Sequence, residues 1–118
     1  MNKPPDISQN TLTHVVGLES SVKVLAALSH AARLQIFQEL SHAEPKGLSA
    51  GALAERVGLS PSNLTFHLKE LKNAGLIHAE REGRFTHLRA NIIFLSSVLE
   101  DVVGTCCGGN PKQCGLFD

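Results

Sequence analysis

The chain has 118 residues, the length of one domain with a thin core, and its 11 basic and 11 acidic residues cancel. A balanced charge neither requires nor excludes a nucleic-acid partner, but so small a core favours association with a second copy. No run approaches the roughly 18 apolar residues that span a membrane, and the polar, proline-broken start does not resemble a secretory signal, so we expect a cytoplasmic protein without a membrane partner.

Two helices are predicted in the first third of the chain. Their apolar faces consist of Val22, Leu25 and Leu28 in the first helix and of Leu34, Phe37 and Leu40 in the second. The break between them falls at Ser29, which can cap the second helix. A polar stretch over residues 41–47, which contains Pro45, ends that helix. We assign residues 1–18 to an N-terminal arm and residues 19–103 to the folded domain.

A helix-turn-helix pattern follows in the middle of the chain. Ser49 can cap a short helix that closes at Gly58, where a left-handed residue is favoured. After the turn, Ser60 can cap a second helix with Pro61 at its first position, and Gly75 closes it. A short helix, a glycine turn and a helix that begins with small polar side chains are typical of DNA-binding proteins that insert the second helix into the major groove.

The second helix of this pattern, the reading helix, has one apolar and one polar face. Its predicted inward residues are Leu64, Leu68 and Leu71. The outward residues comprise short hydrogen bonders, one aromatic ring and two lysines, namely Ser62, Asn63, Thr65, Phe66, Lys69 and Lys72. Together with the capping Ser60, these side chains form the predicted DNA-contacting surface of the helix.

A β-hairpin is predicted next, because residues 76–81 and 85–89 read as two short strands joined by a glycine turn at 82–84. Such a hairpin forms a wing beside the reading helix. Arg81 and Arg84 would then lie where they can contact phosphates or enter the minor groove. Taken alone, these residues read as ordinary surface charges, and it is the preceding helix-turn-helix that favours DNA contact.

Asn91 is expected to cap a last helix from residue 92 to about residue 103. Apolar residues surround this helix almost completely: Ile92, Ile93, Phe94, Leu95, Val98, Leu99, Val102 and Val103. A helix of this kind must bury a second face, so we expect a homodimer. Two-fold pairing would set the two reading helices about 34 Å apart, one turn of B-DNA, which predicts an inverted-repeat operator.

All three cysteines lie in a tail that we assign to residues 104–118, namely Cys106, Cys107 and Cys114. An odd number of thiols cannot be consumed by intramolecular disulfides, and thiolates prefer soft, thiophilic ions. Three sulfurs without an obvious fourth ligand favour pyramidal As(III) or Sb(III) over tetrahedral zinc. We expect the last helix to end before the cysteines. Inert tail cysteines, a Cd, Pb or Zn site, and a sensor of thiol oxidation stay open as alternatives.

The helix-turn-helix region resembles the ArsR/SmtB family of metal-responsive repressors. The resemblance lies in LAERVGLSPSNLTFHLKEL from Leu53 to Leu71, in its continuation through AGLI to REGR at residues 81–84, and in the segment over residues 27–36. It covers about residues 19–103. The resemblance implies a mainly α, winged helix-turn-helix homodimer that binds DNA when metal-free and releases it when metal binds. It also implies a phosphate contact for His67.

Two departures from the family pattern affect the predicted contacts. Phe66 stands where the family often has Arg or Gln, and its ring suits a thymine methyl group instead. The Cys-x-Cys pair of many arsenic-sensing members is absent from residues 48–53, and the last helix lacks the histidines of zinc-sensing members. Similarity to members with a C-terminal Cys-Cys pair implies that sensing falls to Cys106, Cys107 and Cys114.

The resulting prediction is a repressor of an arsenic-resistance operon, with As(III) or Sb(III) as inducer and double-stranded DNA as partner. A thiol enzyme such as an arsenate reductase is disfavoured. Its cysteine would open a phosphate-cradling loop that ends in Arg, whereas the sixth residue after Cys106 is Lys112 and the sixth after Cys107 is Gln113.

Overall fold

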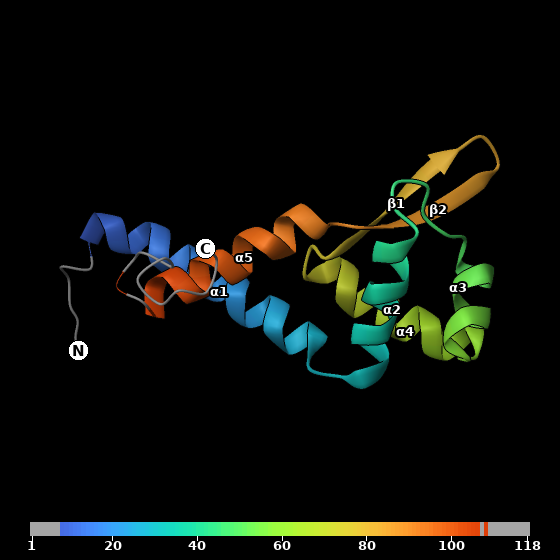
Figure 1. The fold of residues 1–118 in the computed structure, drawn as a ribbon, viewed down its shortest axis with the longest axis horizontal. Coiled ribbons are helices and arrows are strands. Elements are labelled where there is room, and N and C mark those ends of the chain that lie inside the picture. The colour runs from blue at the N-terminus through green and yellow to red at the C-terminus, as the bar shows by residue number, and fades with distance from the viewer. Residues whose placement is uncertain (1–7, 107, 109–118) are drawn as a thin grey trace.

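The computed structural model describes residues 8–106 and 108, with side chains from residue 17 onward. The elements in chain order are α1 (Ser8–Leu28), α2 (Ala31–His42), α3 (Ala50–Val57), α4 (Pro61–Asn73), β1 (Ile77–Glu82), β2 (Phe85–Ala90) and α5 (Ile92–Cys106). Figure 1 shows α2, α3, α4 and the hairpin at one end of the molecule and the α1/α5 pair at the other. The predicted mainly helical fold with a small β-hairpin is confirmed.

One apolar core joins the helix-turn-helix to the rest of the chain. Leu64, Leu68 and Leu71 of α4 are buried, as their spacing predicted. They share this core with residues of the neighbouring helices and of the hairpin, including Val24, Ile36, Leu40, Leu53, Leu76 and Leu88. Burial of these side chains is the main favourable term that fixes α4 against the body of the domain.

The α1–α2 junction corrects one predicted cap. The hydroxyl of Ser29 donates back to the Ala26 carbonyl at 2.8 Å, so Ser29 closes α1. His30 is the N-cap of α2, with an extended backbone, and its Nδ1 accepts from the amide of Ala32 at 3.3 Å. The prediction that Ser29 caps α2 is therefore wrong, because its hydroxyl is engaged by the preceding helix.

The predicted caps of the helix-turn-helix are confirmed. Ser49 accepts from the amide of Ala52 at 3.1 Å, and Gly58 closes α3 in the left-handed region with φ of 69°. Ser60 accepts from the amide of Asn63 at 3.3 Å, with Pro61 at the first position of α4. These local signals set where the reading helix begins.

The hairpin is antiparallel and its register runs from Ile77 opposite Ala90 to Glu82 opposite Phe85. Gly83, with φ of 64°, lies in the tight turn. Leu88 of β2 exchanges two backbone hydrogen bonds with Leu48, at 3.1 and 2.7 Å. The wing is thereby tied to the segment that leads into α3.

Helices α1 and α5 do not begin and end at the predicted domain boundaries. Helix α1 begins at Ser8, so the predicted limit at residue 18 falls inside one continuous helix. Asn91 caps α5 through its side-chain oxygen, as expected, but α5 runs to Cys106 rather than ending before the cysteines. The two helices pack closely at Gly17, where a Cβ would lie 2.8 Å from Oδ2 of Asp101. None of the helices in the described part of the chain is long and apolar enough to cross a membrane.

Candidate nucleic-acid interface

The outward face of α4 is the first component of the candidate interface. All seven predicted residues of this surface are exposed: Ser60, Ser62, Asn63, Thr65, Phe66, Lys69 and Lys72. The Thr65 hydroxyl donates to the carbonyl of Pro61 at 2.8 Å, whereas the Phe66 ring is 57 % exposed. The periodicity of α4 therefore separated its core face from its polar face correctly.

His67 does not belong to that outward face. It is 8 % exposed, and its Nδ1 accepts a hydrogen bond from Nε of Arg33 at 3.1 Å. Its ring lies 4.8 Å from the ring of His30, centroid to centroid. Burial lowers the pKa of His67, and the nearby His30 and Arg33 lower it further, so the neutral ring is favoured. The placement does not support the phosphate contact inferred for this histidine from the family resemblance.

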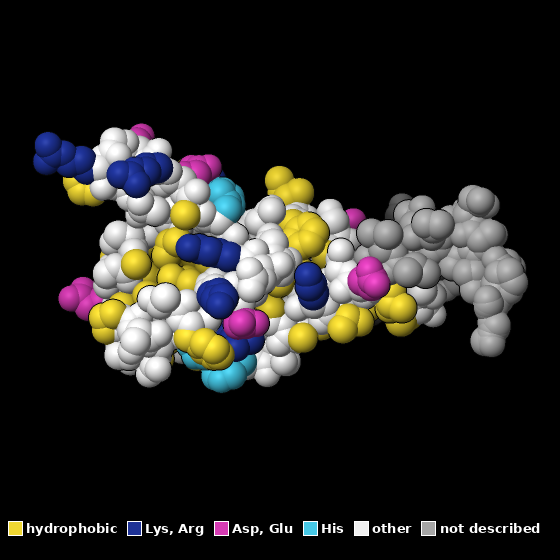
Figure 2. Space-filling model, turned by 180° about the vertical axis from the view of Figure 1, so that it is seen from behind, with side chains coloured by type: hydrophobic (Ala, Val, Ile, Leu, Met, Phe, Trp, Pro, Cys, Tyr) yellow, Lys and Arg dark blue, Asp and Glu magenta, His cyan; other side chains and the backbone are white. Residues whose placement is uncertain are grey.

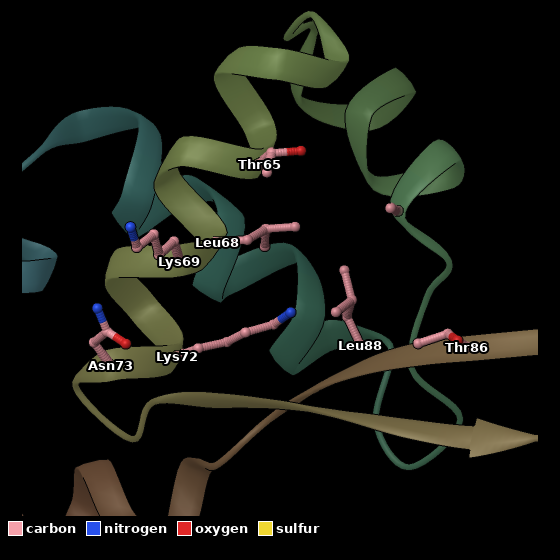
Figure 3. Close-up of a pocket in the computed structure, with 8 residues that line it drawn as sticks. Thr65, Leu68, Lys69, Lys72, Asn73, Thr86 and Leu88 are labelled. Atoms are coloured by element: carbon pink, nitrogen blue, oxygen red, sulfur yellow. The ribbon is translucent and has the colours of Figure 1, made fainter.

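A groove between α4 and the hairpin is the second component. Figure 3 shows Lys72 extending from α4 toward Leu88 of β2, across the space between the two elements. Polar side chains from both elements line the groove beside an apolar floor, and the lining residues are Ala50, Thr65, Leu68, Lys69, Lys72, Asn73, Thr86 and Leu88. A groove with two lysines, two threonine hydroxyls and an asparagine amide can hold a polyanionic backbone.

Sequence reasoning missed the contributions of Asn73 and Thr86 to this groove. Asn73 is the last residue of α4, and Thr86 belongs to β2. The sequence did place Asn73 at the end of the α4 pattern and Thr86 within the predicted strand, and these placements could have suggested that the two side chains are exposed. Their convergence depends on how the hairpin packs against α4, which the local pattern does not specify.

The wing is the third component. Arg81 and Arg84 are exposed, and Phe85 beside them is 70 % exposed. Basic side chains gather at the tip of the projecting hairpin and over the helical body on the same face of the molecule (Figure 2). The two arginines therefore lie on a protrusion beside the groove, as the glycine turn predicted.

Arg89 fixes the wing rather than extending the basic surface. Its guanidinium donates to both carboxylate oxygens of Glu44, at 3.1 and 2.6 Å, and to Glu80 at 3.0 Å. Glu44 also accepts from the amide of Ala90 at 3.2 Å. The hydrogen bond from Arg89 is the main reason that the pKa of Glu44 is lowered. Sequence reasoning assigned no role to this cluster, in which Arg89 and Glu44 lie 45 residues apart in the chain.

The predicted metalloid site falls mostly outside the described residues. Cys106 is a free, exposed thiol at the end of α5. Cys107 and Cys114 lie outside the part of the chain that the structure describes. Within the described part, no group of three or more His, Cys, Asp or Glu side chains is arranged to hold a metal ion. A site for As(III) or Sb(III) at the three cysteines therefore stays a prediction.

Comparison with known proteins supports the reading of the helix-turn-helix. Residues 28–80, from the end of α1 into β1, match a family profile described as a helix-turn-helix domain. The HTH-type transcriptional regulator YgaV of Escherichia coli (strain K12) is 38 % identical over 66 residues. That alignment covers 56 % of this chain and 65 % of YgaV, slightly less than two thirds of the relative's length.

Solved structures share the fold over most of the chain. An ArsR-like transcriptional regulator from Rhodococcus sp. RHA1 matches with a TM-score of 0.67 and 28 % identity, over 75 % of this chain and 80 % of that one. The homodimeric winged helix-turn-helix DNA-binding domain of a possible ArsR-family regulator from Mycobacterium bovis matches with a TM-score of 0.61. It is 22 % identical and the match covers 89 % of this chain and 95 % of that one, a likeness that shows the fold alone.

Proposed function

Because the helix-turn-helix domain and the similar structures support an ArsR-like winged-helix transcriptional regulator rather than an enzyme, we propose that this chain is a DNA-binding repressor. The observation that carries the proposal is the exposed polar face of α4 together with the lysine-lined groove that joins it to the hairpin and the exposed arginines of the wing. The helix would enter the major groove while Arg81 and Arg84 contact phosphates or the minor groove. Such a repressor would act in the cytoplasm.

The repressor would work as a homodimer through α1 and α5. Among the residues whose side chains the structure describes, six of the nine exposed large hydrophobic side chains lie on these two helices: Leu18, Val22 and Leu25 on α1, and Ile92, Ile93 and Leu99 on α5. Apolar side chains clustered on adjacent helices favour burial against a partner, and a second copy supplies a matching surface. Two-fold pairing would present two copies of α4 to an inverted-repeat operator.

The proposed inducer is As(III) or Sb(III), bound by the thiolates of Cys106, Cys107 and Cys114. The support from the structure is the position of Cys106, which is exposed at the end of the helix that packs on α1. Metalloid binding there would bias the arrangement of the α1/α5 pair and hence the spacing of the reading helices. A tenfold loss of operator affinity requires only about 1.4 kcal/mol of coupling.

The test is operator release by the reduced protein. A promoter fragment of an arsenic-resistance operon is titrated with protein, then with arsenite, antimonite, zinc, cadmium or peroxide. A variant with Cys106, Cys107 and Cys114 all changed to Ser is the control, because it should bind DNA and ignore metalloids. Release of the wild type alone by arsenite and antimonite is the expected result.

Release of the DNA by another agent would support the proposed repressor function but would contradict As(III) or Sb(III) as its inducer. Release by cadmium or zinc would indicate a different soft-metal site, and release by peroxide would indicate oxidation of the same thiols. If the triple variant still released DNA on arsenite addition, the three thiols would not be the sensor. If no duplex DNA were bound at all, the proposed repressor function would fail.

A further inference from the structure

Arg33 lies on α2, outside the helix-turn-helix pair, yet its side chain contacts two consecutive residues of the reading helix. Its Nε donates to Nδ1 of His67 at 3.1 Å. The central carbon of its guanidinium lies 5.6 Å from the centroid of the Phe66 ring. The Phe66 and His67 rings themselves meet edge to face at 5.5 Å. The guanidinium is thus held at the surface of α4 by a hydrogen bond and an aromatic ring.

The charge of Arg33 is not neutralised by the described part of the protein. Arg56 pairs with Glu39 and Arg89 pairs with Glu44 and Glu80, but no carboxylate of the described residues lies within 4.0 Å of the Arg33 guanidinium. Glu70 lines the same shallow groove as Arg33 but forms no ion pair with it, and the other charged side chain along that groove, Lys23, is itself a cation. Like Arg81 and Arg84 of the wing, Arg33 therefore forms no ion pair with a carboxylate of the described residues.

The two contacts leave the outer end of the guanidinium available. Nε is used by His67, whereas the terminal N–H groups have no hydrogen-bond partner among the described residues. A guanidinium presents its donors in a fixed planar fork that matches phosphate oxygens, and stacking on an aromatic ring orients that fork. The ordering cost of a phosphate contact is then reduced, because the side chain is held before DNA binds.

We propose that Arg33 is a DNA-phosphate-binding residue, positioned beside the reading helix by the Phe66 ring and by His67. This inference rests on the proposed DNA-binding function and adds a contact from α2 to it. It also gives the exposed Phe66 ring a role as the platform of an arginine. Since the ligand is a phosphate, the contact strengthens binding to every DNA sequence about equally.

The experiment measures how operator affinity depends on salt. Each phosphate contact adds about 0.9 to the slope of log K against log salt concentration. In a dimer, Arg33→Gln should therefore lower the magnitude of the slope by about 1.8 and weaken binding to operator and unrelated duplexes alike. Gln keeps a donor for His67, so the variant should remain folded, which circular dichroism and thermal unfolding would check.

Two further variants separate charge from positioning. Arg33→Lys keeps the charge but loses the stacked fork, so it should keep most of the slope while weakening operator binding roughly tenfold. Phe66→Leu removes the platform and should lower the effect of a subsequent Arg33→Gln change, as a double-mutant cycle would report. Lys23→Ala is the matched control, because it removes a cation from the same groove on α1 and should leave the slope unchanged.

The proposal is overturned if Arg33→Gln keeps the wild-type slope and lowers only the thermal stability, since Arg33 would then be a structural link between α2 and α4. An equal loss of slope in Lys23→Ala would also contradict it, because the effect would then reflect the general field of the surface. These outcomes leave the repressor intact. If the wild-type protein binds no duplex at low salt, the proposed function and the Arg33 contact fail together.

Discussion

His67 places an ionisable ring in the contact between α2 and α4, next to two other basic side chains, His30 and Arg33. Its folded-state pKa lies below the ordinary value of 6.5, mainly because the ring is buried. The unfolded chain therefore binds more protons than the folded one just below pH 6.5. The stability that the neutral ring contributes is present above pH 6.5 and is lost as the pH falls from there toward the folded pKa.

We expect the free energy of unfolding of the wild type to fall more steeply than that of His67→Gln between pH 7.5 and 5.5. Gln keeps an acceptor for Arg33 but does not titrate. Urea unfolding at a series of pH values gives both curves, and His42→Gln at an exposed position of α2 is the control. Parallel curves for wild type and His67→Gln would show that the ring is not protonated on unfolding.

The elements were predictable where their signals are local. Ser49, Gly58, Ser60 and Asn91 each act within a few residues, so the beginnings of α3, α4 and α5 and the turn of the helix-turn-helix followed from the sequence. Arg33 and His67 are 34 residues apart, and Arg89 and Glu44 are 45 apart. Such pairs are created by packing, and no local pattern of residue types specifies them.

The same distinction explains the missed boundaries at the ends of the fold. Asn91 marks the start of α5 locally, whereas Gly104, the first residue of the assigned tail, does not end the helix but is buried within α5, which continues to Cys106. Helix α1 likewise begins at Ser8, within a stretch that composition alone assigned to an arm.

The structural importance of the contact between the α2–α3 loop and the wing can be tested at two glycines that both have a left-handed backbone conformation. Gly58 has φ of 69° and open space around it, so Gly58→Ala should cost only about 1 kcal/mol of unfolding free energy. Gly47 has φ of 82°, and a Cβ there would lie 2.5 Å from the carbonyl oxygen of Leu88 in β2. Gly47→Ala therefore has to displace the backbone of the wing as well.

We expect Gly47→Ala to lose more unfolding free energy than Gly58→Ala in urea titrations and, at a pH and temperature where both stay folded, to bind operator DNA more weakly. The reason is that β2 carries Thr86 of the groove and follows the turn that carries Arg84. Equal losses of stability for the two variants would mean that the Leu48–Leu88 junction does not constrain the wing.

At the scale of the whole molecule, the reading surface and the apolar α1/α5 surface belong to different parts of the fold. Figure 1 shows the hairpin, α3 and α4 at one end and the α1/α5 pair at the other. Dimerisation through α1 and α5 would therefore leave both reading helices free to contact DNA. Assembly and recognition should be separable by mutation.

Ile93 is the best position for that separation, because its side chain is 82 % exposed in the single chain and lies on α5. Ile93→Lys should leave the fold intact and weaken dimerisation by at least about a hundredfold, since a lysine that loses its water in an apolar interface carries a large desolvation cost. Sedimentation equilibrium measures the change. Leu34→Lys, which makes the same substitution on α2, is the control and should stay dimeric.

The operator then reports the consequence of losing the dimer. A monomeric Ile93→Lys protein keeps α4 and the wing, so it should bind a single half-site as weakly as the wild type does. It should lose the higher affinity that the wild-type dimer has for two linked half-sites. Gel-shift titrations with a full inverted repeat and with one half-site compare the two. If Ile93→Lys stayed dimeric, or if it lost half-site binding as well, α5 would not be an interface separate from the reading surface.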